Sequence, residues 1–315
     1  MSRPLAALTG GTGFLGRAVA AALDRAGWQV RLLARRYPVH EQLRDVDVEL
    51  VAGGLEDMAA LRHLVRGASL VVHAAGLTKA VDRAHFFAVN EAGSARLAAA
   101  MREVAPAARL IALSSLAARE PSLSAYAASK RAGETALLAA GLASPPIILR
   151  PTAIYGPWDG ELLPFFRAAA RGLVPLPGRR PARVTLIHVE DAAAAVAACA
   201  GPRAMPGIWE ISDARSEGYA WPEVVSALAV ALGRPARSVG VPGGFLQAAG
   251  VASATAARLR RRAVMLTRGK ARELLHPDWS IGAAAGLPPD LWRPSIGLGE
   301  GFSATAAWYR RHSWL

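Results

Sequence analysis

The stretch that decides the fold is Thr9-Gly10-Gly11-Thr12-Gly13-Phe14-Leu15-Gly16, which follows the apolar segment Leu5–Thr9 and opens an alanine-rich helical pattern. In such a loop, Gly10 permits the tight turn, Gly13 lets the backbone approach a pyrophosphate, and Gly16 allows close helix–sheet packing. The N-terminus of the following helix offers free N–H groups and a positive dipole end to phosphates. The loop therefore predicts a dinucleotide site. Its expected contacts are Gly10, Thr12, Gly13, Phe14, Leu15 and Gly16.

The first half of the chain alternates short β-rich segments with longer Ala/Leu-rich helical patterns, as in parallel strands joined by helices. The predicted strands are Leu5–Thr9, Val30–Ala34, Val48–Ala52, Leu70–Ala74, Arg109–Ser114 and Ile147–Arg150. The predicted helices are Gly16–Ala26, Met58–Arg66, Ala88–Val104 and Ala125–Ala140. This order predicts an α/β fold, a Rossmann doubly wound parallel sheet with its ligand at the carboxyl ends of the strands.

Glycine and proline breaks loosen the pattern beyond Pro151. We expect two domains: a Rossmann domain over residues 1–157, and a smaller C-terminal substrate lobe over residues 158–315 that is interleaved with the last sheet strands.

Composition and charge exclude several classes of protein. The net charge of +13 is carried mostly by arginine, but the basic residues are spread along the chain without a nucleic-acid-binding motif. We therefore predict no nucleic-acid partner. No apolar run reaches the roughly 20 residues of a membrane span, and the early first strand leaves no room for a signal peptide, so a cytoplasmic location is expected. The lone Cys199 and the histidine spacing predict neither a disulfide nor a metal site.

The end of the second predicted strand bears on the choice of cofactor. It continues as Ala34-Arg35-Arg36, at about the place where an NAD-binding protein carries an acid for the ribose 2′-hydroxyl. Guanidinium groups instead bind a 2′-phosphate through charge-assisted hydrogen bonds. The sequence favours NADP(H) over NAD(H), with Arg35 and Arg36 on the phosphate. The alternative is that both arginines are solvated residues at a strand end.

Ser114-Ser115 ends the fifth predicted strand, and Tyr126-Ala127-Ala128-Ser129-Lys130 opens the next helix. With the glycine loop, these segments resemble the short-chain dehydrogenase/reductase family, in particular its extended branch, the NAD-dependent epimerase/dehydratase family. Further matching segments are His73-Ala74-Ala75-Gly76, Val89-Asn90 with Gly93, Leu149-Arg150-Pro151, Tyr155-Gly156-Pro157, His188-Val189-Glu190-Asp191, Glu300-Gly301-Phe302 and Trp308-Tyr309. The resemblance covers essentially the whole chain and is most specific over residues 5–157.

The resemblance implies roles for four residues. Hydride transfer at a carbonyl requires a proton at its oxygen, and a nearby ammonium stabilises the phenolate of a tyrosine. Tyr126 and Lys130, at i and i+4, share a helical face. By resemblance, Tyr126 is the acid/base, Lys130 lowers its pKa and anchors the ribose, Ser115 rather than Ser114 holds the substrate oxygen, and Asn90 supports the geometry and the proton path. The remaining implied cofactor contacts are Leu55, Ala74, Ala75, Gly76, Tyr126, Lys130, Pro151 and Ile154.

The sequence departs from the family pattern at two places, one that bears on the adenine contacts and one that bears on the reaction. Gly53-Gly54-Leu55 replaces the usual Gly-Asp-Leu, so adenine contacts are expected from the Leu55 backbone or near Asp57. Ser115 is followed by Leu116-Ala117-Ala118 instead of the acidic residues of the dehydratases. The sequence therefore disfavours dehydration.

Two segments of the C-terminal half bear on the substrate. Trp158–Leu176 is apolar, which fits either a packed helix or a hydrophobic substrate channel. Phe245–Leu275 has the composition of a basic amphipathic helix, which would either lie on an anionic bilayer or pack on the lobe. The basic residues of that second segment are Arg258, Arg260, Arg261, Arg262, Arg268, Lys270 and Arg272. Three arginines that could bind a diphosphate are Arg179, Arg180 and Arg183.

We therefore expect an oxidoreductase that interconverts a ketone and a secondary alcohol on a small, apolar, lipid-like molecule. It is closest in character to the 3β-hydroxysteroid dehydrogenases or bacterial keto-sphingolipid (ceramide) reductases of the family. A nucleotide-sugar epimerase or reductase is the first alternative, and a non-catalytic dinucleotide-binding structural or regulatory protein is the second. Peripheral contact with the inner face of the cell membrane, and a monomer or homodimer, are further expectations.

Overall fold

The computed structural model describes residues 3–37, 40–178, 182–259, 264 and 266–315. The chain divides into two compact units, each of which is described by itself. The first unit comprises Met1–Arg150, Ala193–Trp209 and Leu287–Trp292. The second comprises Pro151–Ala192, Glu210–Gly286 and Arg293–Leu315.

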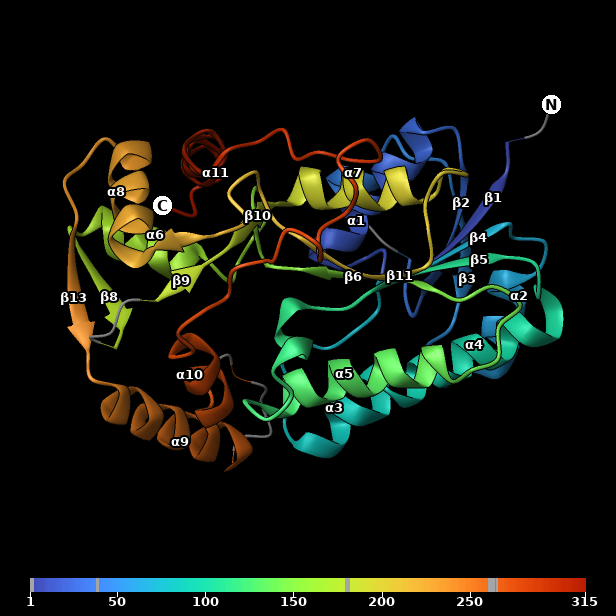
Figure 1. Ribbon diagram of the computed structural model, residues 1–315, viewed down its shortest axis with the longest axis horizontal. Coiled ribbons are helices and arrows are strands. Elements are labelled where there is room, and N and C mark those ends of the chain that lie inside the picture. The colour runs from blue at the N-terminus through green and yellow to red at the C-terminus, as the bar shows by residue number, and fades with distance from the viewer. Residues whose placement is uncertain (1–2, 38–39, 179–181, 260–263, 265) are drawn as a thin grey trace. The chain divides into compact units, whose positions relative to one another are not determined.

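The first unit is built on a seven-stranded sheet in the order β11-β6-β5-β4-β1-β2-β3 (Figure 1). Its strands are β1 (Leu5–Thr9), β2 (Gln29–Ala34), β3 (Val48–Ala52), β4 (Leu70–His73), β5 (Arg109–Leu113), β6 (Ile147–Pro151) and β11 (Gly207–Ile211). The pairings from β6 to β3 are all parallel. The order 3-2-1-4-5-6 confirms the predicted Rossmann sheet, and the carboxyl ends of β1 and β4 lie side by side where the order reverses.

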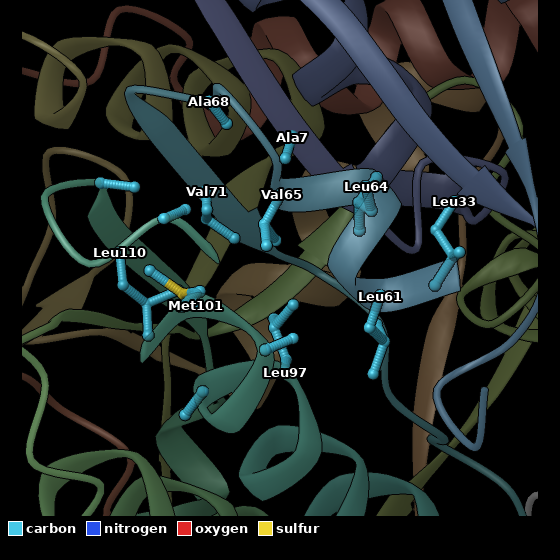
Figure 2. Close-up of a cluster of buried hydrophobic side chains, with 14 of the residues drawn as sticks. Ala7, Leu33, Leu61, Leu64, Val65, Ala68, Val71, Leu97, Met101 and Leu110 are labelled. Carbon is cyan, nitrogen blue, oxygen red and sulfur yellow. The ribbon is translucent and has the colours of Figure 1, made fainter. Parts of the chain in front are cut away.

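Helices cover both faces of this sheet (Figure 1). They are α1 (Phe14–Arg25), α2 (Met58–Val65), α3 (Arg83–Asn90), α4 (Ala92–Val104) and α5 (Ala125–Leu138), with short 3₁₀ turns η1 (Glu41–Leu43) and η2 (Leu116–Arg119). Figure 2 shows the core between α2, α4 and the sheet, where Leu61, Leu64 and Leu97 are fully buried against strand residues such as Val71 and Leu110. This packing holds α4 and the neighbouring α5 against the sheet.

The predicted helix Ala88–Val104 is wrong in its extent, because two helices occupy this region. The Asp82 carboxylate accepts a hydrogen bond from His85 N at 2.8 Å, so a helix starts at Arg83. At the break, the Ser94 hydroxyl donates to Asn90 O at 2.7 Å, a back-bond that bends helices. A Cβ on Gly133 of α5 would overlap with the same Asn90 carbonyl. The break therefore lets α5 approach the residue that ends α3.

The described residues of the second unit form three two-stranded sheets, of β7 with β10, β9 with β12, and β8 with β13. The strands are β7 (Ala153–Tyr155), β8 (Leu173–Pro177), β9 (Arg183–Val184), β10 (Leu186–His188), β12 (Tyr219–Ala220) and β13 (Arg237–Val241). The helices are α6 (Leu163–Ala170), α8 (Trp221–Leu232), α9 (Gly243–Leu259), α10 (Arg268–Leu274) and α11 (Leu298–Arg311). Helix α7 (Val189–Cys199) begins in this unit and belongs to the first unit from Ala193 onward. Its core is aromatic: Tyr155, Phe166, Phe302 and Tyr309 are fully buried and meet edge to face.

Neither apolar segment of the C-terminal half is one continuous helix. Within Trp158–Leu176, only α6 is helical: it has Pro164 in its first turn, and Gly172 at φ +84° ends the turn that follows it before β8. Phe245–Leu275 contains α9 and α10 as separate helices. Arg179, Arg180, Arg260, Arg261 and Arg262 lie outside the described residues.

Candidate active site

The glycine loop makes a tight turn at the end of β1. Gly10 has φ +74°, a left-handed conformation that favours glycine, and Gly13 N donates to Gly10 O at 2.9 Å. A Cβ on Gly16 would overlap with that same Gly10 carbonyl. Gly13 is exposed at the N-cap of α1, and among the described residues no side chain caps it. The first N–H groups of α1 are therefore available to an anion.

The turn after β4 lies against this loop. Ala74 N donates to Thr9 O at 3.1 Å, and Ala75 N donates to the Thr9 hydroxyl at 3.3 Å. A Cβ on Gly10 would overlap with Ala75 N. The structure thus brings together two predicted groups of cofactor contacts, residues 10–16 and residues 74–76, through backbone contacts that leave no room for a side chain.

His73, the last residue of β4, is a structural residue. Its Nδ1 lies 2.7 Å from Thr9 Oγ1 and its Nε2 lies 3.0 Å from Ser94 Oγ. Complete burial, with a smaller contribution from the Lys130 charge, lowers the pKa of His73 to about 3. The ring is neutral and joins β1, β4 and α4 behind the loop.

Arg35 and Arg36 follow β2 and are both exposed. A third arginine, Arg17, was not predicted. Its guanidinium donates to Thr12 O and to Gln42 Oε1, each at 2.8 Å, and burial lowers its pKa. It therefore ties the glycine loop to η1, which follows β2. Its position directly after Gly16 is the sequence signal that could have revealed it.

Leu55 and Asp57, which follow β3 and are predicted to lie near the adenine, both have structural contacts. The Leu55 side chain is buried in the core against Gly93, whose added Cβ would meet Leu55 Cδ1 at 2.7 Å, so only the Leu55 backbone is left for a ligand. The Asp57 carboxylate accepts from Ala60 N at 3.0 Å and caps α2. Pro151 ends β6, and Ile154 lies in β7 of the second unit.

Helix α5 carries Tyr126 and Lys130. Ser124 caps it by accepting from Ala127 N at 2.9 Å, which places half-buried Tyr126 in the first turn, with its ring centroid 6.1 Å from that of Phe86. Lys130 Nζ donates to Leu113 O, at the end of β5, at 2.7 Å. A Cβ on Gly76 would lie 3.4 Å from Lys130 Nζ and 3.2 Å from Asn90 Oδ1. The ammonium therefore lies beside the turn that contacts the glycine loop.

Asn90 joins that turn to α5. Its Oδ1 accepts from Leu77 N at 2.8 Å, and its Nδ2 donates to Leu77 O at 3.1 Å and to Ser129 Oγ at 2.9 Å. The Ser129 hydroxyl in turn donates to Tyr126 O at 2.7 Å. Asn90 thus positions the helical turn that bears Tyr126 and Lys130.

The two serines at the end of β5 differ in their contacts. Ser115 Oγ accepts from Ala117 N at 3.2 Å, which caps η2 and leaves its O–H to donate elsewhere. The Ser114 hydroxyl donates to Glu134 Oε1. Glu134 also accepts two hydrogen bonds from Arg150, at 2.8 and 2.6 Å, in a buried pair. Sequence reasoning gave no role to Glu134, although it lies one turn beyond Lys130 on α5.

Burial lowers the pKa of Lys130 to about 8, against the opposing charge of Glu134. Burial of the charged ammonium lowers the free energy of unfolding by its full amount below about pH 8. This loss of stability shrinks as the pH rises toward the pKa of a free lysine. The chain has only three lysines, Lys79, Lys130 and Lys270. We expect one of three lysine side-chain NMR signals of the ligand-free protein to titrate near pH 8 and to be absent from Lys130→Met. A Lys130 signal that is still fully protonated at pH 10 would contradict this environment.

Comparison with known proteins agrees with this geometry. Residues 6–211 match the model of the NAD dependent epimerase/dehydratase family. The chain belongs to this family. It is 45% identical over 318 residues to the ceramide reductase of Caulobacter vibrioides, covering all of this chain and 97% of that protein. It is 28% identical to the 2-alkyl-3-oxoalkanoate reductase of Shewanella oneidensis, over 85% of this chain and 76% of that one.

Solved structures agree on the fold. The UDP-glucose 4-epimerase of Thermus thermophilus, determined in complex with NAD, matches with a TM-score of 0.71 at 22% identity, over 97% of this chain and 99% of that one. Family membership confirms the resemblance inferred from the motifs. Within the described ranges, no helix is long and apolar enough to cross a bilayer, and no cluster of three metal-ligating side chains occurs.

Proposed function

We propose that the protein is an NADP(H)-dependent ketoreductase that acts on a hydrophobic, lipid-like ketone such as a 3-keto sphingolipid. The observation that carries the reaction is the convergence of Lys130 Nζ and Asn90 beside Gly76, one helical turn from Tyr126 and next to the glycine loop. The full-length likeness to a ceramide reductase, at 45% identity, supports the substrate class. The exposed, uncapped N-terminus of α1 fits the phosphates of a dinucleotide.

The side chains of the site supply the proton that the carbonyl oxygen needs during reduction. When bound, the nicotinamide supplies the hydride to the carbonyl carbon. The Tyr126 hydroxyl donates its proton to the carbonyl oxygen, and the Lys130 ammonium stabilises the phenolate that remains. The Ser115 hydroxyl donates a hydrogen bond to the same oxygen. Asn90 and Ser129 hold Tyr126 in place through the backbone of α5.

The function is tested by following NADPH oxidation by the purified protein. Long-chain 3-keto lipids presented in mixed micelles should be reduced, while UDP-sugars should be neither reduced nor epimerised. Turnover of the sugars alone would overturn the lipid assignment. Binding of NADPH without turnover of either class would favour the non-catalytic alternative.

The proposed cofactor preference rests on Arg35 and Arg36. Replacing Arg35 by aspartate should lower the affinity for NADPH by about tenfold or more, because a charge-assisted hydrogen bond to the 2′-phosphate is lost and a like charge is introduced. The affinity for NADH should change little. Fluorescence titration of both dinucleotides measures the two values.

Arg66→Asp is the matched control, because it makes the same change of charge at the exposed C-cap of α2. In a parallel sheet the C-termini of the connecting helices lie at the edge opposite to the ligand. An equal loss of NADPH affinity in both variants would show that the effect is one of overall charge, and not of a 2′-phosphate contact.

A further inference from the structure

The outward face of α9 is apolar. Residues exposed on it recur at spacings of three and four, as on one side of a helix. They are Phe245, Ala248, Val251, Ala252, Thr255 and Ala256. Phe245 is 68% exposed and Val251 is 48% exposed. The Thr255 hydroxyl donates to Val251 O at 2.9 Å within the helix, so the side chains described on this face, up to residue 256, offer water almost no polar group.

The opposite face of α9 packs on α10, and Figure 1 shows the two helices side by side. Gly250 is buried there, and a Cβ on it would lie 2.7 Å from the carbonyl carbon of Thr267, just before α10. The orientation of α9 is therefore set by a close backbone contact. A surface helix ordinarily turns a polar face outward, whereas the outward face of α9 is apolar.

The charge around α9 has one sign. Between Glu223 and Glu273 lie 49 residues with nine basic and no acidic side chains. Among those that the structure describes, Arg234 and Arg237 precede α9 and are exposed, and Arg268 and Arg272 are exposed on α10. An exposed apolar helix flanked by guanidinium groups has the composition of an interfacial helix on an anionic bilayer.

We propose that the outward face of α9 binds peripherally to anionic lipid bilayers. Phe245 and Val251 enter the boundary between headgroups and acyl chains, and the flanking arginines contact lipid phosphates. A second copy of this chain is a poorer occupant, because a symmetric contact would place the same basic side chains opposite one another. The inference does not depend on the proposed ketoreductase activity, because it follows from the surface alone.

The test is flotation of the purified full-length protein with vesicles of phosphatidylcholine alone or mixed with phosphatidylglycerol. We expect binding to the mixed vesicles that weakens as salt is raised, and little binding to phosphatidylcholine. Phe245→Ser combined with Val251→Ser should weaken binding by about tenfold or more, because apolar burial is lost. Arg268→Gln should weaken it by about fivefold.

Val230→Ser is the matched control, since Val230 is 76% exposed on α8, outside the α9 face. It should bind vesicles as the parent protein does, and all variants should keep the parent circular dichroism spectrum. The proposal fails if the mixed vesicles do not bind, or if the double serine variant binds as well as the Val230 control. It also fails if the protein is a dimer that the double variant dissociates, because the face would then belong to a second copy.

Discussion

Replacing Tyr126 by phenylalanine should lower kcat for ketone reduction by about 10²- to 10⁴-fold, the usual contribution of a positioned acid or base. The change removes only the hydroxyl that we propose gives its proton to the substrate oxygen. Phenylalanine keeps the ring and its contact with Phe86, so the helical turn should be preserved. Steady-state kinetics with saturating NADPH measure the loss.

The affinity of Tyr126→Phe for NADPH should stay within a few-fold of the parent, because the glycine loop and Lys130 are intact. Tyr37→Phe, which removes a hydroxyl from a 74% exposed tyrosine, serves as the control and should retain full activity. Undiminished activity of Tyr126→Phe would show that another group supplies the proton.

Replacing Glu134 by leucine should destabilise the protein by about 3–5 kcal/mol, the usual cost of leaving one member of a buried ion pair without its partner. Glu134 and Arg150 have side chains only 3% and 9% exposed. Without the carboxylate, the Arg150 guanidinium and the Ser114 hydroxyl both lose an acceptor. Urea unfolding measures the change in the free energy of unfolding.

Adding Arg150→Met to Glu134→Leu should recover part of that loss, because the double variant buries no unpaired charge. The exposed Arg62–Glu103 pair is the matched control, and Glu103→Leu should have a much smaller effect because water screens both charges. Strictly additive effects of the Glu134 and Arg150 changes would contradict the coupling.

The sheet was predictable because its strands are short, buried β-rich segments in a fixed alternation with helices. All six predicted strands lie within one residue of their observed ends. The glycine loop made the strand order predictable as well, since it marks the first strand of a Rossmann unit. What the periodicity did not reveal was the break at Asn90, which depends on a side-chain contact to the backbone and on the approach of α5.

The C-terminal half was less predictable because its apolar residues do not follow one period. Phe165 and Phe166 lie in a helix, whereas Leu173 and Leu176 lie in β8, and hydrophobicity alone does not separate them. The composition of Phe245–Leu275 suggested one amphipathic helix, but the observed helices are two, and Gly250 packs where they meet. Glycine in a helix interior lowers helix propensity, and here its use is the close contact.

In the candidate site, too, some features were predictable from the sequence and others were not. The spacing of Tyr126 and Lys130 was sufficient to place them on one face of α5, because a helix fixes the relation of i and i+4. Arg17 and Glu134 were missed because their roles depend on partners from elsewhere in the chain, Gln42 and Arg150. Such partners are brought together only by the folded sheet.

The packing of Gly16 against the Gly10 carbonyl limits how this protein can change. Any larger residue at either position must displace backbone, so random mutagenesis of Gly10 and Gly16 should return almost no functional clones without glycine there. Arg35 and Arg36, by contrast, are exposed beyond the end of β2, so their replacement displaces no backbone. On the proposed cofactor assignment, a change of dinucleotide preference would therefore be made at the end of β2, and the glycine turn would stay the same.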